Sequence, residues 1–152
     1  MGQDDPWDNW NRTYQEVDVP RLLLREQVYA DSIDSDPRAV KFYVRQKAYR
    51  FSGKFTGQWR RLSDERREVM KSTFKILSGA NPIFDETKDE VAIEFEGQTH
   101  WLPIQPQLVK PFKKEIKKGT DVFLYCMYFN QHKADGRLFN VFFISEFRND
   151  RK

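Results

Sequence analysis

Cysteine and histidine, the residues most often found in metal and nucleophilic sites, are scarce in this chain. Cys126 is the single cysteine, which excludes an internal disulfide and a zinc site built from several cysteines. It lies in the apolar run 122–129, where we expect a buried, unreactive thiol. The alternative is a nucleophilic pair of Cys126 with His100, which requires an electropositive and partly exposed thiol.

Local signatures of enzymes and membrane segments are also missing. The sequence has no G-x-S-x-G, H-E-x-x-H, glycine-rich phosphate loop or EF-hand loop. No apolar stretch approaches 18 residues, so we expect no transmembrane helix. No basic segment followed by an apolar one opens the chain, but residues 1–7 are unusual as a native start. We therefore weigh export with a removed leader against a cytoplasmic location, and we assign no catalytic residue, metal ligand or cofactor.

Aromatic and charged residues are abundant instead. Aromatics make up 15% of the 152 residues, which favours a folded domain over disorder. The net charge of +3 conceals an uneven distribution. Residues 1–36 carry 9 acidic and 3 basic groups, whereas residues 37–80 carry 3 acidic and 12 basic groups. We expect these opposite blocks to neutralise one another in the fold, with an open basic block as the alternative.

The N-terminal part predicts two helices. Trp7, Trp10 and Tyr14 follow the spacing of a short helix. A second helix is predicted from Pro20, which suits a first helical turn, to the loop signal at 34–37. We accordingly divide the chain into an acidic N-terminal arm and helix, 1–36, and a single α+β domain, 37–152.

The middle of the chain predicts a helix over 37–47 and a strand over 48–56, where Tyr49, Phe51 and Phe55 alternate with polar residues. Ser63 is a favourable N-cap, and the helix that it opens is expected to reach Leu77.

The C-terminal half predicts four strands and one helix. A hairpin at 97–98 joins the half-buried strand 91–95 to the strand 99–104, and Pro103 places that second strand at an edge or rim. A short helix containing Phe112 follows. The strands 121–129 and 138–147 are apolar at nearly every position, and the segment 130–136 between them is interpreted as an exposed turn.

The fold class expected is α+β, with N-terminal helices followed by a small, mostly antiparallel sheet or partly open barrel. The order strand–strand–helix–strand–strand, with 48–56 before it, is similar in outline to an OB-type barrel, which runs three strands, a helix and two strands. Order of elements is an analogy of fold and implies no function.

The function that we favour is a non-catalytic binding or accessory module for a protein, a peptide or a small ligand. Tryptophan near the rim of a fold is often an anchor for a partner. The candidate ligand-binding residues are Trp59, Arg60, Arg61, His100 and Trp101.

Two alternatives remain open. A single-stranded nucleic-acid-binding domain could use the basic, aromatic block 37–80, because phosphates require clustered cations and bases stack on aromatic rings. The other alternative is an enzyme with scattered carboxylates. The densest acidic segment, 85–90, is predicted to be a solvated loop.

Overall fold

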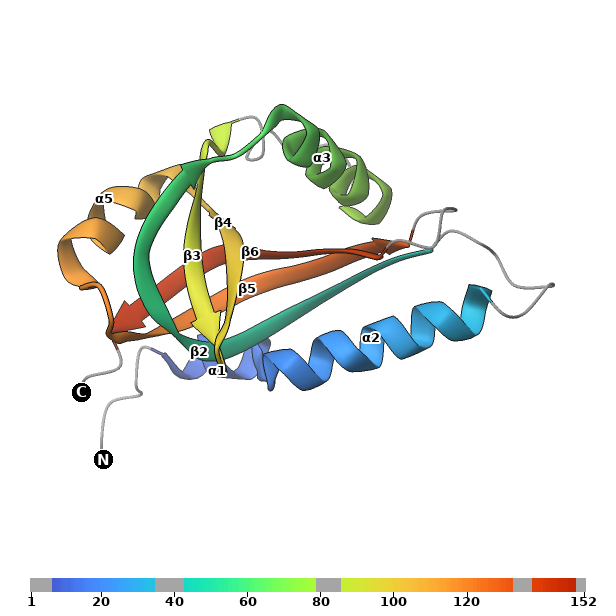
Figure 1. Cartoon of the computed structure of the whole chain (residues 1–152), viewed down its shortest axis with the longest axis horizontal. Helices are drawn as coiled ribbons and strands as arrows, with labels where there is room; N and C mark the ends of the chain where they lie inside the picture. The colour runs from blue at the N-terminus through green and yellow to red at the C-terminus, as the bar shows by residue number, and fades with distance from the viewer. Residues whose placement is uncertain (1–6, 35–42, 79–85, 133–137, 150–152) are drawn as a thin grey trace.

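A computed structural model of the chain describes residues 7–34, 43–78, 86–132 and 138–149 (Figure 1). The helices are α1 (Asp8–Thr13), α2 (Val19–Asp34), α3 (Asp64–Ser78) and α5 (Pro106–Glu115). The strands are β1 (Gln15–Glu16), β2 (Tyr43–Arg61), β3 (Asp89–Phe95), β4 (Gln98–Ile104), β5 (Asp121–His132) and β6 (Leu138–Asn149).

The strands form one mixed sheet that closes into a barrel. Their order is β1-β2-β3-β4-β6-β5, and an additional antiparallel pairing between β2 and β5 closes the ring of five strands. The pairings β1–β2 and β4–β6 are parallel, and the other four are antiparallel. The expected α+β fold with a mostly antiparallel, partly open barrel is confirmed.

The helix predicted over 37–47 is wrong for residues 43–47, which belong to β2; residues 37–42 lie outside the described part. Strand β2 pairs with β5 without interruption from Tyr43, opposite His132, to Lys54, opposite Asp121. The apolar residues of this stretch fit both the 3.6-residue period of a helix and the two-residue period of a strand, so the local pattern did not distinguish the two. The long partner strand decides the outcome, because pairing satisfies the backbone groups along both strands.

Strand β2 bends where it passes from one neighbour to the other. Lys54 pairs with both Asp121 of β5 and Glu94 of β3. Next to it, a Cβ atom at Gly53 would lie 2.5 Å from Cγ2 of Ile93 and 2.6 Å from Cε1 of Phe95. Glycine therefore permits a close approach of the backbone to the side chains of the barrel interior.

Three helices cover the barrel (Figure 1). Helix α5 closes one end, where the fully buried Phe112 packs against Phe55 and Phe147. Helix α2 packs through Val19 and Leu22 against the main core. Helix α3 covers a second apolar cluster on the opposite face of the long strands β5 and β6, made by Leu62, Met70, Phe129, Val141 and Phe143.

The predicted helix from Ser63 is confirmed. The backbone N–H of Arg66 donates to Oγ of Ser63 at 3.1 Å, which is the hydrogen bond expected of an N-cap serine. Two i, i+3 ion pairs follow it, from Asp64 to Arg67 and from Glu68 to Lys71. None of the described helices is both long enough and apolar enough to cross a bilayer.

One side of the barrel is joined weakly. In the described part of the chain, β4 and β6 share a single registered pair, Ile104 with Ile144. The backbone N–H of Gln105 adds a long hydrogen bond of 3.5 Å to the carbonyl of Ile144. Beyond this point no registered pair joins β4 to β6 among the described residues, and we call this unpaired boundary between the two strands the seam.

Candidate functional site

A pocket of about 370 Å³ lies at the seam. This volume falls within the range of small-ligand sites. Strand β4 contributes to one wall, β6 to another, α2 to a third, and the end of β2 with α3 to the rest. The lining residues, which define the seam pocket, are Leu23, Arg60, Arg66, His100, Trp101, Asn140 and Phe142.

The cationic side of the seam pocket is organised by Glu90. Its carboxylate is fully buried and accepts hydrogen bonds from Nε of Arg60 at 2.8 Å and Nε of Arg66 at 2.9 Å. One oxygen is engaged by each arginine. Buried carboxylates need such partners because an unpaired charge in the interior is strongly destabilised. The Glu90 carboxylate therefore holds the two arginine side chains in place.

Arg60 also lies over the indole of Trp101, with its guanidinium carbon 4.3 Å from the ring centroid. This is the geometry of a cation–π contact. The bond to Glu90 uses Nε, and the two terminal nitrogens of Arg60 have no hydrogen-bond acceptor among the described residues. The indole N–H of Trp101 likewise has no acceptor in that part of the chain. Both side chains keep donors available to a ligand.

His100 forms the inner edge of the seam pocket, beside the core residue Phe95, with ring centroids 5.6 Å apart. Partial burial lowers the pKa of His100 below its ordinary value of 6.5. The imidazole is therefore mostly neutral at neutral pH, and the positive charge of the pocket comes from the arginines.

A polar network connects helix α2 to the pocket. Asn130 of β5 is fully buried and donates through Nδ2 to Glu26 of α2 at 2.8 Å and to the hydroxyl of Tyr128 at 2.9 Å. The Tyr128 hydroxyl in turn donates to Oδ1 of Asn140, which lines the pocket. Asn130 and Tyr128 therefore link α2, which supplies Leu23 to the pocket, to the side chain of Asn140.

Three of the five residues predicted to bind a ligand meet at the seam pocket: Arg60, His100 and Trp101. The other two lie elsewhere. Trp59 packs edge-on against Phe55 and Phe112. Arg61 is exposed on β2, 3.7 Å from Asp89. Successive side chains of a strand point to opposite faces, so the side chains of Trp59 and Arg61 lie on the face of β2 opposite to that of Arg60, and neither lines the pocket.

Sequence reasoning missed the apolar lining residues Leu23 and Phe142, and also the polar residues Arg66, Asn140 and Glu90. Arg66 is the third residue after the N-cap Ser63, in the first turn of a helix. Asn140 is a polar interruption of an apolar strand. Glu90 belongs to the segment that was interpreted as a solvated loop, but it is a fully buried residue of β3.

The structure also bears on the two opposite charge blocks. Within the basic block, Arg60 and Arg66 both form ion pairs with Glu90 of β3. The arm contacts the block at Arg50, whose Nε donates to the carbonyl of Tyr14 at 2.9 Å. The aromatic residues Tyr49, Phe51 and Phe55 of the block are buried in the core, so they offer no exposed stacking platforms.

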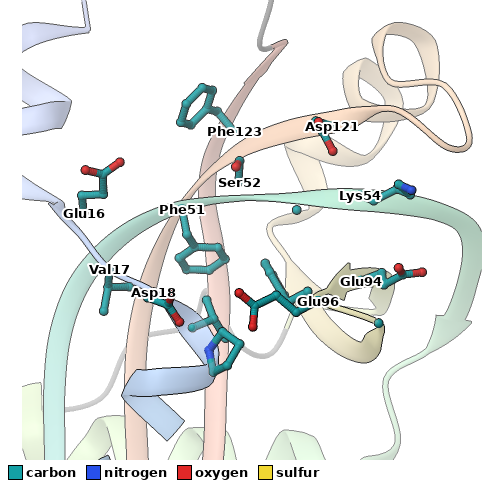
Figure 2. A pocket seen from close by; sticks show the side chains of 15 residues that line it. Glu16, Val17, Asp18, Phe51, Ser52, Lys54, Glu94, Glu96, Asp121 and Phe123 are labelled. Carbon is teal, nitrogen blue, oxygen red and sulfur yellow. The ribbon is translucent and has the colours of Figure 1, made fainter.

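A second, acidic pocket of about 430 Å³ lies between β1, β2 and the β3–β4 hairpin (Figure 2). Lys54 is the one lysine in the lining, and the carboxylates come from five positions along the chain: Glu16, Asp18, Glu94, Glu96 and Asp121. No three of the described His, Cys, Asp or Glu side chains are grouped so that they could hold a metal ion. The pocket therefore gives no defined metal centre in the described residues.

Cys126 lies in β5 and is fully buried. Burial raises the pKa of its thiol well above the ordinary value, so the thiol stays protonated at neutral pH. This environment is that of a structural cysteine and does not favour the nucleophilic pair with His100.

Comparison with protein-family models, with curated proteins and with solved structures finds no match to this chain.

Proposed function

We propose that this chain is a non-catalytic binding module whose ligand occupies the seam pocket. The observation that carries the proposal is the buried carboxylate of Glu90, which holds Arg60 and Arg66 at one opening of the barrel. Such an arrangement keeps the cations in position, so a ligand need not order them on binding.

The donors and acceptors around the pocket favour an anionic ligand rich in acceptors. Both oxygens of Glu90 are engaged by arginines, and Oδ1 of Asn140 accepts from Tyr128. In contrast, the terminal nitrogens of Arg60, the indole N–H of Trp101 and Nδ2 of Asn140 have no acceptor among the described residues. A carboxylate, sulfonate or phosphate group supplies what these donors lack, because charge-assisted hydrogen bonds to arginine are strong.

A titration of the isotope-labelled protein with benzenesulfonate, followed by NMR, tests this proposal. The probe combines a flat ring with a charge that does not change with pH. We expect chemical-shift changes at the Trp101 indole, at His100 and at Asn140. The Arg60→Gln variant should bind at least about tenfold more weakly, since it loses a charge-assisted contact of about 1.5–3 kcal/mol.

Arg61→Gln is the matched control, because it removes the same charge one residue away from a side chain that lies outside the pocket. Equal weakening in both variants would indicate a general charge effect and no defined site. Shift changes confined to other surfaces would contradict the proposal.

Single-stranded nucleic acid remains a second candidate ligand of the same module. One observation favours it: the seam pocket lies beside β4 and the segment joining β2 to β3, and in OB-type barrels the corresponding strands and loop bind oligonucleotides. The burial of Tyr49, Phe51 and Phe55 counts against stacking of successive bases. Binding of a ten-nucleotide oligothymidylate distinguishes the two candidate ligands. If nucleic acid is the ligand, the protein should bind this oligonucleotide, the affinity should fall steeply with increasing salt, and Arg60→Gln should abolish binding.

A further inference from the structure

We propose that the physiological occupant of the seam is an extended, acidic peptide segment of a partner protein, which adds as a strand along the open edge of β4. This inference rests on the proposed binding function and names the class of ligand. It follows from the backbone of the two seam strands and from the charge above them.

Pro103 shows which backbone groups of β4 face the seam. It lies opposite Glu90 in the β3–β4 ladder, and it has no N–H to donate to β3. Residues at every second position of a strand direct their backbone groups to the same side. Thr99 and Trp101 therefore also direct their N–H and C=O groups away from β3, and no described strand pairs with either residue on that side.

Strand β6 presents a similar edge across the opening. The carbonyl of Ile144 accepts from Gln105 and so faces β4. By the same alternation, the backbone groups of Phe142 and Asn140 face the seam, where both residues line the pocket. Two strand edges that have no pairing partner within the described residues thus border one pocket, and an unpaired edge is a ready template for an added strand.

The side chains around the seam specify an alternating partner. Arg60 and Arg66 lie beside Trp101, whereas Leu23 and Phe142 line the pocket from α2 and the inner face of β6. An added strand directs successive side chains to opposite faces. Its acidic side chains would meet the two arginines, and its apolar side chains would enter between α2 and β6. The charge complementarity favours an acidic partner over a neutral one.

Selection from a displayed library of random decapeptides, with the Arg60→Gln protein as competitor, provides the probe. We expect selected peptides to alternate acidic and apolar residues. For the best peptide, replacing its acidic residues by their amides should weaken binding at least about tenfold. Methylating its backbone nitrogens at alternate positions should do the same, because methylation removes the donors of a strand and keeps every side chain.

Amide hydrogen exchange of β4 tests strand addition directly, because a ligand that contacts side chains alone would not slow the exchange of these backbone amides. Binding of the peptide should slow exchange of the Trp101 and Thr99 amides, since both acquire backbone acceptors. A peptide that binds equally well after methylation, or that leaves these amides unprotected, overturns strand addition and leaves the pocket as a side-chain site.

The failures of the two proposals are distinguishable. If no peptide is enriched but benzenesulfonate or oligothymidylate binds at the pocket, the peptide inference is wrong and the binding module stands. If none of the three probes binds there, both proposals are wrong.

Discussion

The carboxylate of Glu90 and the Nε atom of Arg60 lie 2.8 Å apart across the β2–β3 ladder, where the two residues are directly paired. The carboxylate is fully buried, whereas the arginine side chain is 43% exposed. One end of the pair therefore belongs to the packed interior and the other to the seam pocket. The contact joins the stability of the barrel to the geometry of the candidate site.

Removal of this carboxylate should destabilise the protein. In Glu90→Ala, Arg60 and Arg66 lose their shared counter-ion in a partly desolvated setting. Breaking a fully buried pair costs about 3–5 kcal/mol and breaking a surface pair about 0–1 kcal/mol, so we expect a loss of about 2–4 kcal/mol. Urea unfolding measures it.

Arg61→Ala is the control for that experiment. It disrupts the exposed pair with Asp89, at 3.7 Å, and should lower the free energy of unfolding by no more than about 1 kcal/mol. Equal losses in the two variants would mean that burial of Glu90 does not matter.

Gly53→Ala should be destabilising without any change of charge. The added methyl group would lie 2.5 Å from Cγ2 of Ile93 and 2.6 Å from the ring of Phe95, both buried in the core. Overpacking of this kind costs about 1–3 kcal/mol. Thermal unfolding should detect it, and the neighbouring exposed Ser52→Ala should stay within about 0.5 kcal/mol of the wild type. A neutral Gly53→Ala would show that β2 can shift away from β3.

The free energy of unfolding should decrease as the pH is lowered through the range in which His100 titrates. Because burial lowers the pKa of His100 in the folded state, the unfolded chain binds more protons below about pH 6.5. The contribution of the neutral imidazole is therefore present above that pH and is lost as the pH decreases. His100→Gln should flatten this part of the profile between about pH 7.5 and about pH 5.5. Parallel profiles for the two proteins would contradict the prediction.

The thiol of Cys126 should be inert in the native protein. It is fully buried and burial raises its pKa, so an aromatic disulfide reagent should label it only as fast as the chain unfolds. The rate of labelling with increasing urea tests this. Rapid stoichiometric labelling of the folded protein would show that β5 opens locally.

Local signals in the sequence were sufficient for several elements. Ser63 predicted the start of α3, because an N-cap acts through a bond within one turn. Glu96, at φ 50°, and Gly97, at φ 83°, occupy the two turn positions of the hairpin between β3 and β4. The hairpin was therefore predictable to within one residue from Gly97 and the flanking alternation.

Other parts depended on partners that are distant in sequence. The stretch 43–47 joined β2 because β5 lies beside it. Asn130, which was interpreted as part of an exposed turn, is buried because Glu26, 104 residues away, accepts its hydrogen bond. At Asn130 local polarity predicted exposure wrongly, because a buried polar group that finds a hydrogen-bond partner is not forced to the surface.

The sequence by itself determined the strand-rich C-terminal half, the position of α3 and the presence of cations and tryptophans near one another in the chain. The tertiary structure alone decided that Arg60, His100 and Trp101 meet at the seam while Trp59 and Arg61 do not. It also brought Arg66 and Asn140 to them. The physical reason is that secondary structure follows from contacts within a few residues, whereas a binding site depends on strand register, which is set by pairing across the whole chain.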